Sequence, residues 1–149
     1  MTRREFDVVA ADIMERSRDV ILATQSGDAY PHVRMLFNLR CRERFPTLAD
    51  YFRDKRLAVY LSTNTSSVKV RQVGSDARVT VYLALPAEIR GLMLSGRAVP
   101  DAEAKAALWV EGWERYYPLG QTDPDYTILR VDPVLARGWY AGKPIEFTL

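Results

Sequence analysis

The sequence contains one cysteine, Cys41, and one histidine, His32, among 149 residues. A single cysteine excludes an internal disulfide and is typical of the reducing cytoplasm, which is the location that we expect. A structural zinc site needs several cysteine and histidine ligands, so we expect no metal site of this kind. Haem held by a histidine would likewise depend on His32 alone.

Long apolar runs and clusters of basic residues are also missing. No apolar stretch approaches the ~20 residues that span a bilayer as a helix, and the charged N-terminus lacks the apolar core of a signal peptide. We therefore expect no membrane partner. The net charge is +2, and the basic residues are spread along the chain. Because no basic run with interleaved aromatic residues is present, we expect no nucleic-acid partner.

The composition that is present belongs to a globular protein. Hydrophobic residues make up 48% of the chain and charged residues 27%, which are ordinary proportions for a soluble domain. A chain of this length can bury a substantial core. Because internal repeats and linkers are absent, we expect a single domain over residues 1–149.

The first 40 residues have the pattern of a helix followed by a hairpin. Residues 2–5 match a capping box, and apolar residues then recur at helical spacing as far as Met14. Residues 20–24 and 30–40 predict two strands, joined at the turn signal of residues 26–28.

The remaining chain alternates short helices with strands. The predicted helices are residues 47–54, a helix from about residue 66 to Gly74, and residues 102–114 with Asp101 as N-cap. The predicted strands are residues 57–62, 79–85, 92–99 with a bulge at Gly96, and 126–132, followed by an extended piece at 133–140. Two hairpins are incompatible with βαβ alternation. The pattern therefore predicts a closed or nearly closed antiparallel barrel with peripheral helices, in the α+β, mainly β class.

A hydroxyl-rich turn at residues 63–67 joins one predicted strand to the next helix. Lys69 falls in the first turn of that helix. Unpaired N–H groups, the helix dipole and an ammonium group then converge on one place, which suits an anion such as a phosphate. The alternative is a capped helix whose Lys69 is merely solvated.

Arg34 lies in the middle of a predicted strand among apolar neighbours. A charge in such a place needs a partner, although it can also lie on a solvated face of the sheet. We interpret the nearby His32 as an ordinary hydrogen-bonded or exposed histidine.

Four segments, in order along the chain, resemble the motifs of the pyridoxamine-phosphate oxidase superfamily of flavin-binding split barrels, and within it the general stress protein branch. The segments are residues 34–37, 60–69, 96–98 and 113–124. No segment is specific alone, but their order and spacing agree over nearly the whole chain. The resemblance implies a six-stranded antiparallel split β-barrel of Greek-key type.

The resemblance also implies the cofactor FMN. In the family, the arginine of the second strand meets the flavin phosphate, the backbone after it meets the isoalloxazine edge, and a serine-x-lysine motif completes the phosphate site. No catalytic side chain is identified. The cofactor-binding residues that it implies are Arg34, Met35, Leu36, Phe37, Ser62, Thr63, Ser67, Val68, Lys69, Gly91 and Trp113.

A homodimer with the flavin at the subunit interface is implied by the same resemblance. The partner subunit's contacts in the family fall near the strand that begins at Gly91 and near the aromatic cluster around Trp113. The residues themselves point the same way, because Trp109, Trp113, Tyr116 and Tyr117 exceed what one thin helix over a small barrel is expected to bury.

The sequence departs from the true oxidases of the family at three places. Gly91 stands where they have a glutamine, and Val68 where they have an arginine. Trp139 is followed by residues 140–144, without the histidine and arginine that hold pyridoxal phosphate. Activity on the vitamin is therefore not expected, and a deazaflavin in place of FMN stays open.

Two classes of function follow. The first is an FMN-dependent oxidoreductase with an unknown substrate, or a flavin carrier or sensor, in which the cofactor does the chemistry. The second is a binder without a flavin, such as a haem-handling or ligand-sensing split barrel or a small basic nucleic-acid protein.

Overall fold

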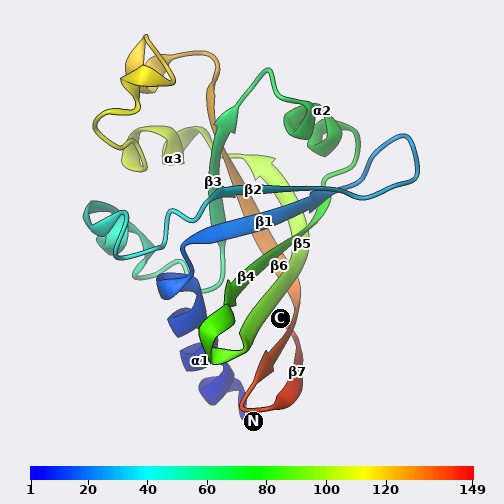
Figure 1. The fold of residues 1–149 in the computed structure, drawn as a ribbon. Helices are drawn as coiled ribbons and strands as arrows, with labels where there is room; N and C mark the ends of the chain where they lie inside the picture. Colours follow the sequence, from blue (N-terminus) through cyan, green and yellow to red (C-terminus); the bar gives the residue numbers. More distant parts are fainter.

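The computed structural model describes all 149 residues, which form three α-helices and seven β-strands (Figure 1). The helices are α1 (Arg3–Arg16), α2 (Val68–Ser75) and α3 (Ala102–Ala107). The strands are β1 (Asp19–Thr24), β2 (His32–Phe37), β3 (Val59–Asn64), β4 (Arg78–Leu85), β5 (Arg90–Pro100), β6 (Tyr126–Tyr140) and β7 (Lys143–Thr148). Short 3₁₀-helices span Pro46–Phe52, Pro86–Glu88, Trp113–Arg115 and Gly120–Thr122.

The strands form one antiparallel sheet in the order β2-β1-β4-β5-β6-β3, and β7 pairs with β6. The end strands β2 and β3 approach each other without pairing, so the six strands close nearly into a barrel with a seam. This arrangement confirms the predicted split barrel with peripheral helices. The seventh strand, β7, was not predicted. It follows a tight turn in which Gly142 has a φ of 73°, a conformation that glycine adopts without strain.

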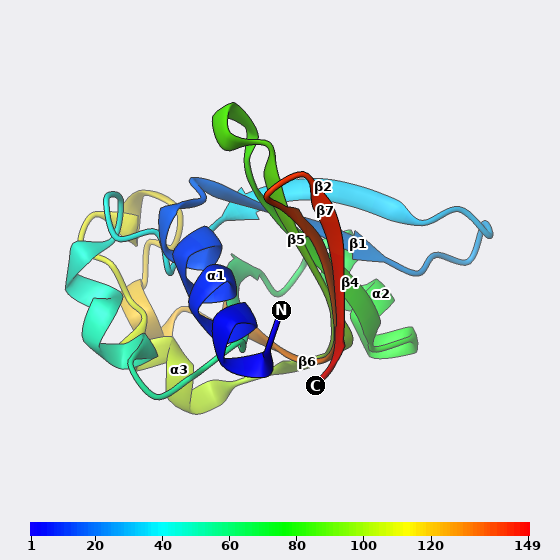
Figure 2. The same ribbon diagram turned by 90° about the horizontal axis from the view of Figure 1, so that it is seen from below.

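Helix α1 begins at the predicted capping box. Oγ1 of Thr2 accepts a hydrogen bond from the Glu5 backbone N–H at 3.2 Å, and Oε2 of Glu5 accepts one from the Thr2 N–H at 2.6 Å. Figure 2 shows α1 against the inner side of the curved sheet. Its buried face is the predicted one, and it packs into the main core of the barrel through Phe6, Val9, Ala10, Ile13 and Met14.

A second core lies on the outer side of β3 and β6. There Tyr60, Tyr126 and Ile128 are covered by α3, the Pro46–Phe52 helix and the segment after α3. The ring centroids of Trp109 and Tyr126 are 5.1 Å apart in an edge-to-face arrangement, a favourable geometry for aromatic pairs. This core fixes the segment after α3 beside the seam of the barrel.

The predicted helix 102–114 is wrong beyond Ala107. Asp101 is the N-cap as predicted, with its side chain accepting from the Ala104 N–H at 3.1 Å. The chain then leaves the helix at Leu108, and Gly112 takes a φ of 96°. The tertiary contacts of Trp109 and Trp113 with Tyr126 override the helical propensity of the sequence.

The predicted strand 30–40 is shortened for a similar reason. β2 ends at Phe37 because the Asn38 amide turns inward and donates to the carbonyl oxygens of Met14 and Ser17, both at 2.7 Å. These bonds satisfy groups at the C-terminal end of α1, which lack helical partners. The remaining strand boundaries differ from the predictions by two residues or fewer, except that β6 continues unbroken to Tyr140.

An irregularity is present beside Gly96 as predicted, but its extra residue, Val134, lies on the neighbouring strand β6. The register between β5 and β6 shifts between Ser95 and Gly96, opposite Pro133. Proline lacks the N–H group of a regular ladder, so a bulge is the place where a sheet accommodates it. The bulge allows β6 to pass through Pro133 as one strand.

The outer face of β2, β1, β4 and β5 is not covered by any helix of the chain. In register across these strands lie Met35, Ile21, Tyr82 and Met93. Met35 is 64% exposed and Tyr82 44%. We call these four residues the apolar row. None of the helices has the length and apolarity of a membrane span.

Candidate functional site

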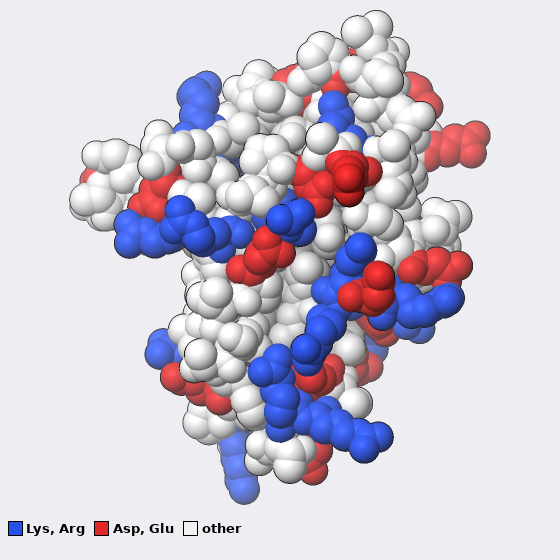
Figure 3. Space-filling model, turned by 180° about the vertical axis from the view of Figure 1, so that it is seen from behind, with Lys and Arg blue, Asp and Glu red and all other residues white.

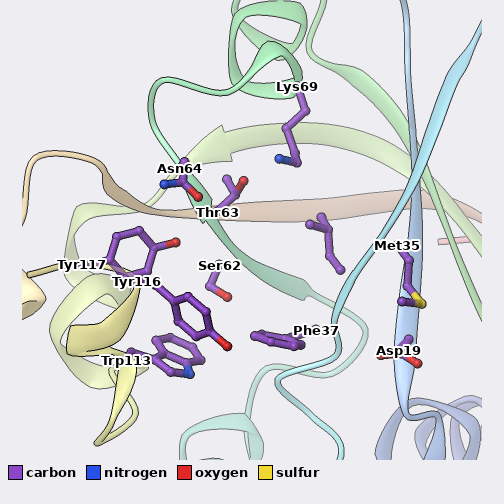
Figure 4. A pocket seen from close by; sticks show the side chains of 11 residues that line it. Asp19, Met35, Phe37, Ser62, Thr63, Asn64, Lys69, Trp113, Tyr116 and Tyr117 are labelled. Atoms are coloured by element: carbon purple, nitrogen blue, oxygen red, sulfur yellow. The ribbon is translucent and has the colours of Figure 1, made fainter.

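A cavity of about 280 Å³ lies at the seam between β2 and β3 (Figure 4). Figure 4 shows Lys69, Thr63 and Asn64 at one end and Phe37 and Trp113 at the other. The cavity therefore has a polar end beside α2 and an aromatic end beside the second core. It is lined by Asp19, Met35, Leu36, Phe37, Ser62, Thr63, Asn64, Lys69, Trp113, Tyr116 and Tyr117.

The polar end is formed at the N-terminus of α2. Ser67 is the N-cap residue, but its side chain makes no capping hydrogen bond. Its Oγ is buried and has no hydrogen-bond partner at all. Buried hydroxyl groups are normally paired, so this oxygen marks a place where an acceptor or donor from outside the chain fits.

Two cations face this end without a carboxylate between them. Burial lowers the pKa of Lys69 from its ordinary value, and the charge of the nearby Arg34 lowers it further. Burial alone lowers the pKa of Arg34. No acidic group therefore contributes to the pKa shift of either residue. Two like charges held together in this way favour the binding of an anion.

Arg34 is held on the inner side of β2 by hydrogen bonds to neutral groups. Its Nη1 donates to Oγ1 of Thr24 at 2.7 Å and to the His32 carbonyl oxygen at 2.9 Å, and its Nη2 donates to Oε1 of Gln72 at 2.9 Å. The charge predicted to need a partner thus has acceptors, but none of them is charged. The guanidinium keeps its full positive charge and a fixed orientation.

The turn between β3 and α2 is fixed by Asp125. Its carboxylate accepts from Nδ2 of Asn64 at 2.6 Å and from the Ser66 N–H at 2.9 Å, and its backbone oxygen accepts from the Thr65 N–H at 2.7 Å. The hydrogen bond from Asn64 makes the largest contribution to lowering the pKa of Asp125, and the hydrogen bonds from Ser66 make the next largest. The carboxylate stays ionised at neutral pH and holds in place the turn that precedes Ser67.

The aromatic end combines a closed wall with an open rim. Trp113 stacks on Phe37 with ring centroids 6.4 Å apart, and Trp113 and Tyr117 are 4% and 6% exposed. Burial, with a smaller contribution from Asp125 and then Asp123, raises the pKa of Tyr117 to about 12, so its phenol is neutral at pH 7. Tyr116 and Met35 are exposed and leave this side of the cavity open.

The structure brings seven of the eleven sequence-predicted site residues together in the cavity. Arg34 and Ser67 lie at its polar end without lining it. Val68 is half exposed and lines a different hollow, beside the β1–β2 turn. Gly91 lies on β5, away from the cavity, where it pairs with Trp139 and faces the Tyr82 ring.

Sequence reasoning missed four residues of the cavity wall, namely Asp19, Asn64, Tyr116 and Tyr117. Asn64 and the tyrosines fall within the recognised segments, but their direction depends on the second core. Asp19 is engaged by Arg44, whose Nη1 lies 3.1 Å from its carboxylate. Of the late aromatic residues interpreted as a surplus, Trp113 and Tyr117 are buried within the chain itself, whereas Tyr116 is exposed.

Comparison with known proteins places this geometry in context. The family model described as pyridoxamine 5'-phosphate oxidase matches residues 7–140. A comparison with curated protein sequences finds no match.

Solved structures similar to this chain include two proteins related by name to a general stress protein. A protein from Clostridium acetobutylicum, described as related to general stress protein 26 of B. subtilis (pyridoxinephosphate oxidase family), is 28% identical with a TM-score of 0.79. The alignment covers 99% of this chain and 97% of that one. General stress protein 26 from Bacillus anthracis is 19% identical with a TM-score of 0.74, over 97% and 99% of the two chains.

A third similar structure is a haem binding protein from Mycobacterium smegmatis. It is 16% identical with a TM-score of 0.70, and the alignment covers 99% of this chain and 60% of that one. At this identity the likeness concerns the fold alone.

Proposed function

The chain belongs to the pyridoxamine 5'-phosphate oxidase family, and on that premise we propose that it is an FMN-binding flavoprotein that acts as an oxidoreductase on a small molecule. The flavin phosphate would be held at the N-terminus of α2 by Lys69, Arg34 and Ser67. The isoalloxazine ring would lie in the seam between β2 and β3, near the backbone of residues 35–37.

The observation that carries this proposal is the unpaired Oγ of Ser67 beside two cations that lack an anion. A phosphate oxygen accepts a hydrogen bond from this hydroxyl and from the N–H groups at the start of α2, while its charge offsets those of Lys69 and Arg34. A buried hydroxyl and two uncompensated cations are costly without such a ligand. The residues present therefore fit the phosphate of a mononucleotide.

Bound FMN would supply the electron transfer, and the protein would supply binding, orientation and a partly dry slot. Outside the proposed phosphate site, neither Tyr117 nor Asp19 of the cavity wall is suited to act as a general base. The phenol of Tyr117 has a pKa raised to about 12, and the carboxylate of Asp19 is paired with Arg44. The side chains of the cavity would therefore bind and orient the flavin and its substrate.

Haem is a less suitable occupant. Both ring nitrogens of His32, the one histidine of the chain, are already engaged, Nε2 by Asp28 at 2.8 Å and Nδ1 by Gln72 at 2.9 Å. Neither is free to ligate iron without breaking one of these bonds. His32 also does not line the cavity.

A nucleic-acid partner is not supported either. Figure 3 shows that basic side chains gather in a stripe over the lower half of this face, with acidic side chains beside them. Ion pairs are distributed along the whole chain, from that of Arg3 with Asp7 in α1 to that of Arg137 with Glu146 between β6 and β7. A phosphate backbone is bound by unpaired basic clusters.

Identification of the bound chromophore tests the proposal. We expect the purified protein to be yellow and to release FMN, identified by its mass, on heating. Release of a deazaflavin would keep the site and change the cofactor. A haem absorption band with no flavin would overturn the proposal.

We propose in addition that the protein is a homodimer that buries the apolar row. A cavity of about 280 Å³ lies just below the ~300–1,000 Å³ of typical ligand pockets. Met35 belongs both to the open rim of this cavity and to the apolar row. A second copy seated on the row would cover the rim and complete the pocket.

The dimer predicts that Tyr82→Asp yields a monomer. A charge in the centre of the apolar row would have to be buried without a partner, so the dimer dissociation constant should rise by about 100-fold or more. Light scattering at micromolar concentration measures the mass. The control is Val8→Asp, an exposed apolar residue of α1 outside the row, which should leave the mass unchanged. A wild-type monomer would rule out the shared pocket.

Little or no oxidation of pyridoxamine phosphate is expected, even with FMN bound. A second phosphate needs its own buried cations, and the β6–β7 turn offers only Lys143, which lies outside the cavity. An ammonium on a flexible stem is a poor substitute for a bidentate guanidinium. Peroxide detection during aerobic incubation is the assay, and turnover near ~1 per second would contradict the expectation.

A further inference from the structure

The side-chain amide of Gln72, on α2, connects Arg34 to His32. Its Oε1 lies 2.9 Å from Nη2 of Arg34 and 2.6 Å from Oγ1 of Thr24. Its Nε2 lies 2.9 Å from Nδ1 of His32, and Nε2 of His32 lies 2.8 Å from the carboxylate of Asp28. Four side chains of the β1–β2 hairpin are thus linked through one residue of α2.

The guanidinium of Arg34 determines which atoms of this network donate and which accept. A guanidinium only donates, so the amide atom facing Arg34 is the oxygen, and the NH₂ group faces His32. Nδ1 of His32 must then accept a hydrogen bond. The ring proton is therefore on Nε2, where it donates to Asp28. The network is satisfied only in this arrangement, with His32 uncharged.

We propose that Gln72 is a positioning residue for Arg34, and that neutral His32 in turn fixes the orientation of Gln72. This inference rests on the proposed function, because it takes Arg34 as a ligand of the flavin phosphate. Thr24 and the His32 carbonyl hold Nη1 of Arg34. Gln72 holds the other terminal nitrogen, Nη2, and so sets the direction of the guanidinium plane.

Protonation of His32 conflicts with this arrangement. A proton on Nδ1 would place an N–H group against the NH₂ group of Gln72. If the amide rotated to offer its oxygen to His32, its NH₂ group would face the guanidinium of Arg34, and two donors would meet there.

Two charged groups face His32. Asp28, on the β1–β2 turn, contacts Nε2 of the ring, and the guanidinium of Arg34, on β2, contacts the backbone carbonyl of His32. From α2 the ring is contacted by the neutral amide of Gln72. Acidification through the range in which histidines take up a proton therefore releases Gln72 from Arg34, and FMN affinity falls as the pH is lowered.

Gln72→Met tests the positioning role. Methionine keeps the length of the side chain and removes all three of its hydrogen bonds, those with Arg34, Thr24 and His32. We expect FMN to bind the apoprotein ~5- to 20-fold more weakly, whereas riboflavin, which lacks the phosphate, binds as it does to the wild type. An equal loss for both ligands would indicate a general structural defect and would overturn the positioning role.

His32→Asn tests the coupling to pH. The asparagine oxygen can take the place of Nδ1 as acceptor for Gln72, and it does not titrate. Between about pH 8 and about pH 5.5, which spans the titration of a histidine, the dissociation constant of FMN should rise ~5- to 20-fold more for the wild type than for His32→Asn. Protonation of the flavin phosphate, with a pKa of about 6, affects both proteins alike. Coincident pH profiles would overturn the inference.

Failure of the proposed function and failure of the inference about Gln72 give different results. If the wild-type apoprotein does not bind FMN, the proposed function fails and the inference fails with it. If the wild type binds FMN and both variants match it in affinity and pH profile, the function stands and the role of Gln72 is overturned. Should Gln72→Met fold poorly, the comparison of pH profiles decides.

Discussion

Replacement of Lys69 by alanine is expected to weaken FMN binding by ~10- to 100-fold. The substitution removes one of the two cations at the N-terminus of α2, and a hydrogen bond to a charged group contributes about 1.5–3 kcal/mol. Lys69 lines the cavity and has no carboxylate partner to lose. Titration of the apoprotein, followed by flavin fluorescence, measures the effect.

Arg71→Ala provides the matched control. Arg71 lies on the same helix and carries the same charge, but it is exposed and contacts the Ser66 carbonyl and not the cavity. Its removal changes only the distant field, so FMN affinity should change by less than about threefold. Equal losses for Lys69→Ala and Arg71→Ala would show that net charge, and not a phosphate site, governs binding.

Replacement of Gly96 by alanine is expected to destabilise the fold by about 2–3 kcal/mol, in line with overpacked positions. A Cβ atom at Gly96 would lie 2.1 Å from the Asp132 carbonyl oxygen and 2.7 Å from Cα of Pro133. Both are backbone atoms of the bulge, so the strands themselves would have to move. The midpoint of thermal unfolding should fall by ~5–10 °C.

Gly74→Ala is the control for this substitution. Gly74 lies in α2, and a Cβ atom there would meet nothing within 4 Å. Alanine is favoured over glycine in a helix, so this variant should be more stable than the wild type by about 0.5–1 kcal/mol. If Gly96→Ala were as stable as Gly74→Ala, the close contact across the bulge would be wrong.

The elements predicted correctly from sequence depend on local chemistry. The capping box of α1 and the N-cap Asp101 are each determined by residues within a few positions of one another, and the irregularity beside Gly96 was signalled by a glycine inside a strand pattern. The order of strands and helices was sufficient to predict the barrel. The family motifs then located Arg34 and Lys69 on elements that meet at the seam.

The features missed from sequence depend on contacts between distant parts of the chain. Helix α3 ends early because Trp109 and Trp113 pack on Tyr126. The link between Thr24 and Gln72 joins residues 48 positions apart, and no periodicity reveals it. The late aromatic residues were interpreted as a dimer surface, but Trp113 and Tyr117 are buried, and a separate uncovered apolar face, the apolar row, lies across β2, β1, β4 and β5. Such a face becomes recognisable only when strand register is known.

The central claim is that the N-terminus of α2, with Lys69 and Arg34, binds the phosphate of a flavin mononucleotide. Titration of the wild-type apoprotein with FMN and with riboflavin tests it most directly, because the two ligands differ only in that phosphate. We expect one FMN per subunit, bound at least ~100-fold more tightly than riboflavin, as two charge-assisted contacts imply. Equal affinity for the two ligands, or no binding of either, would contradict the claim.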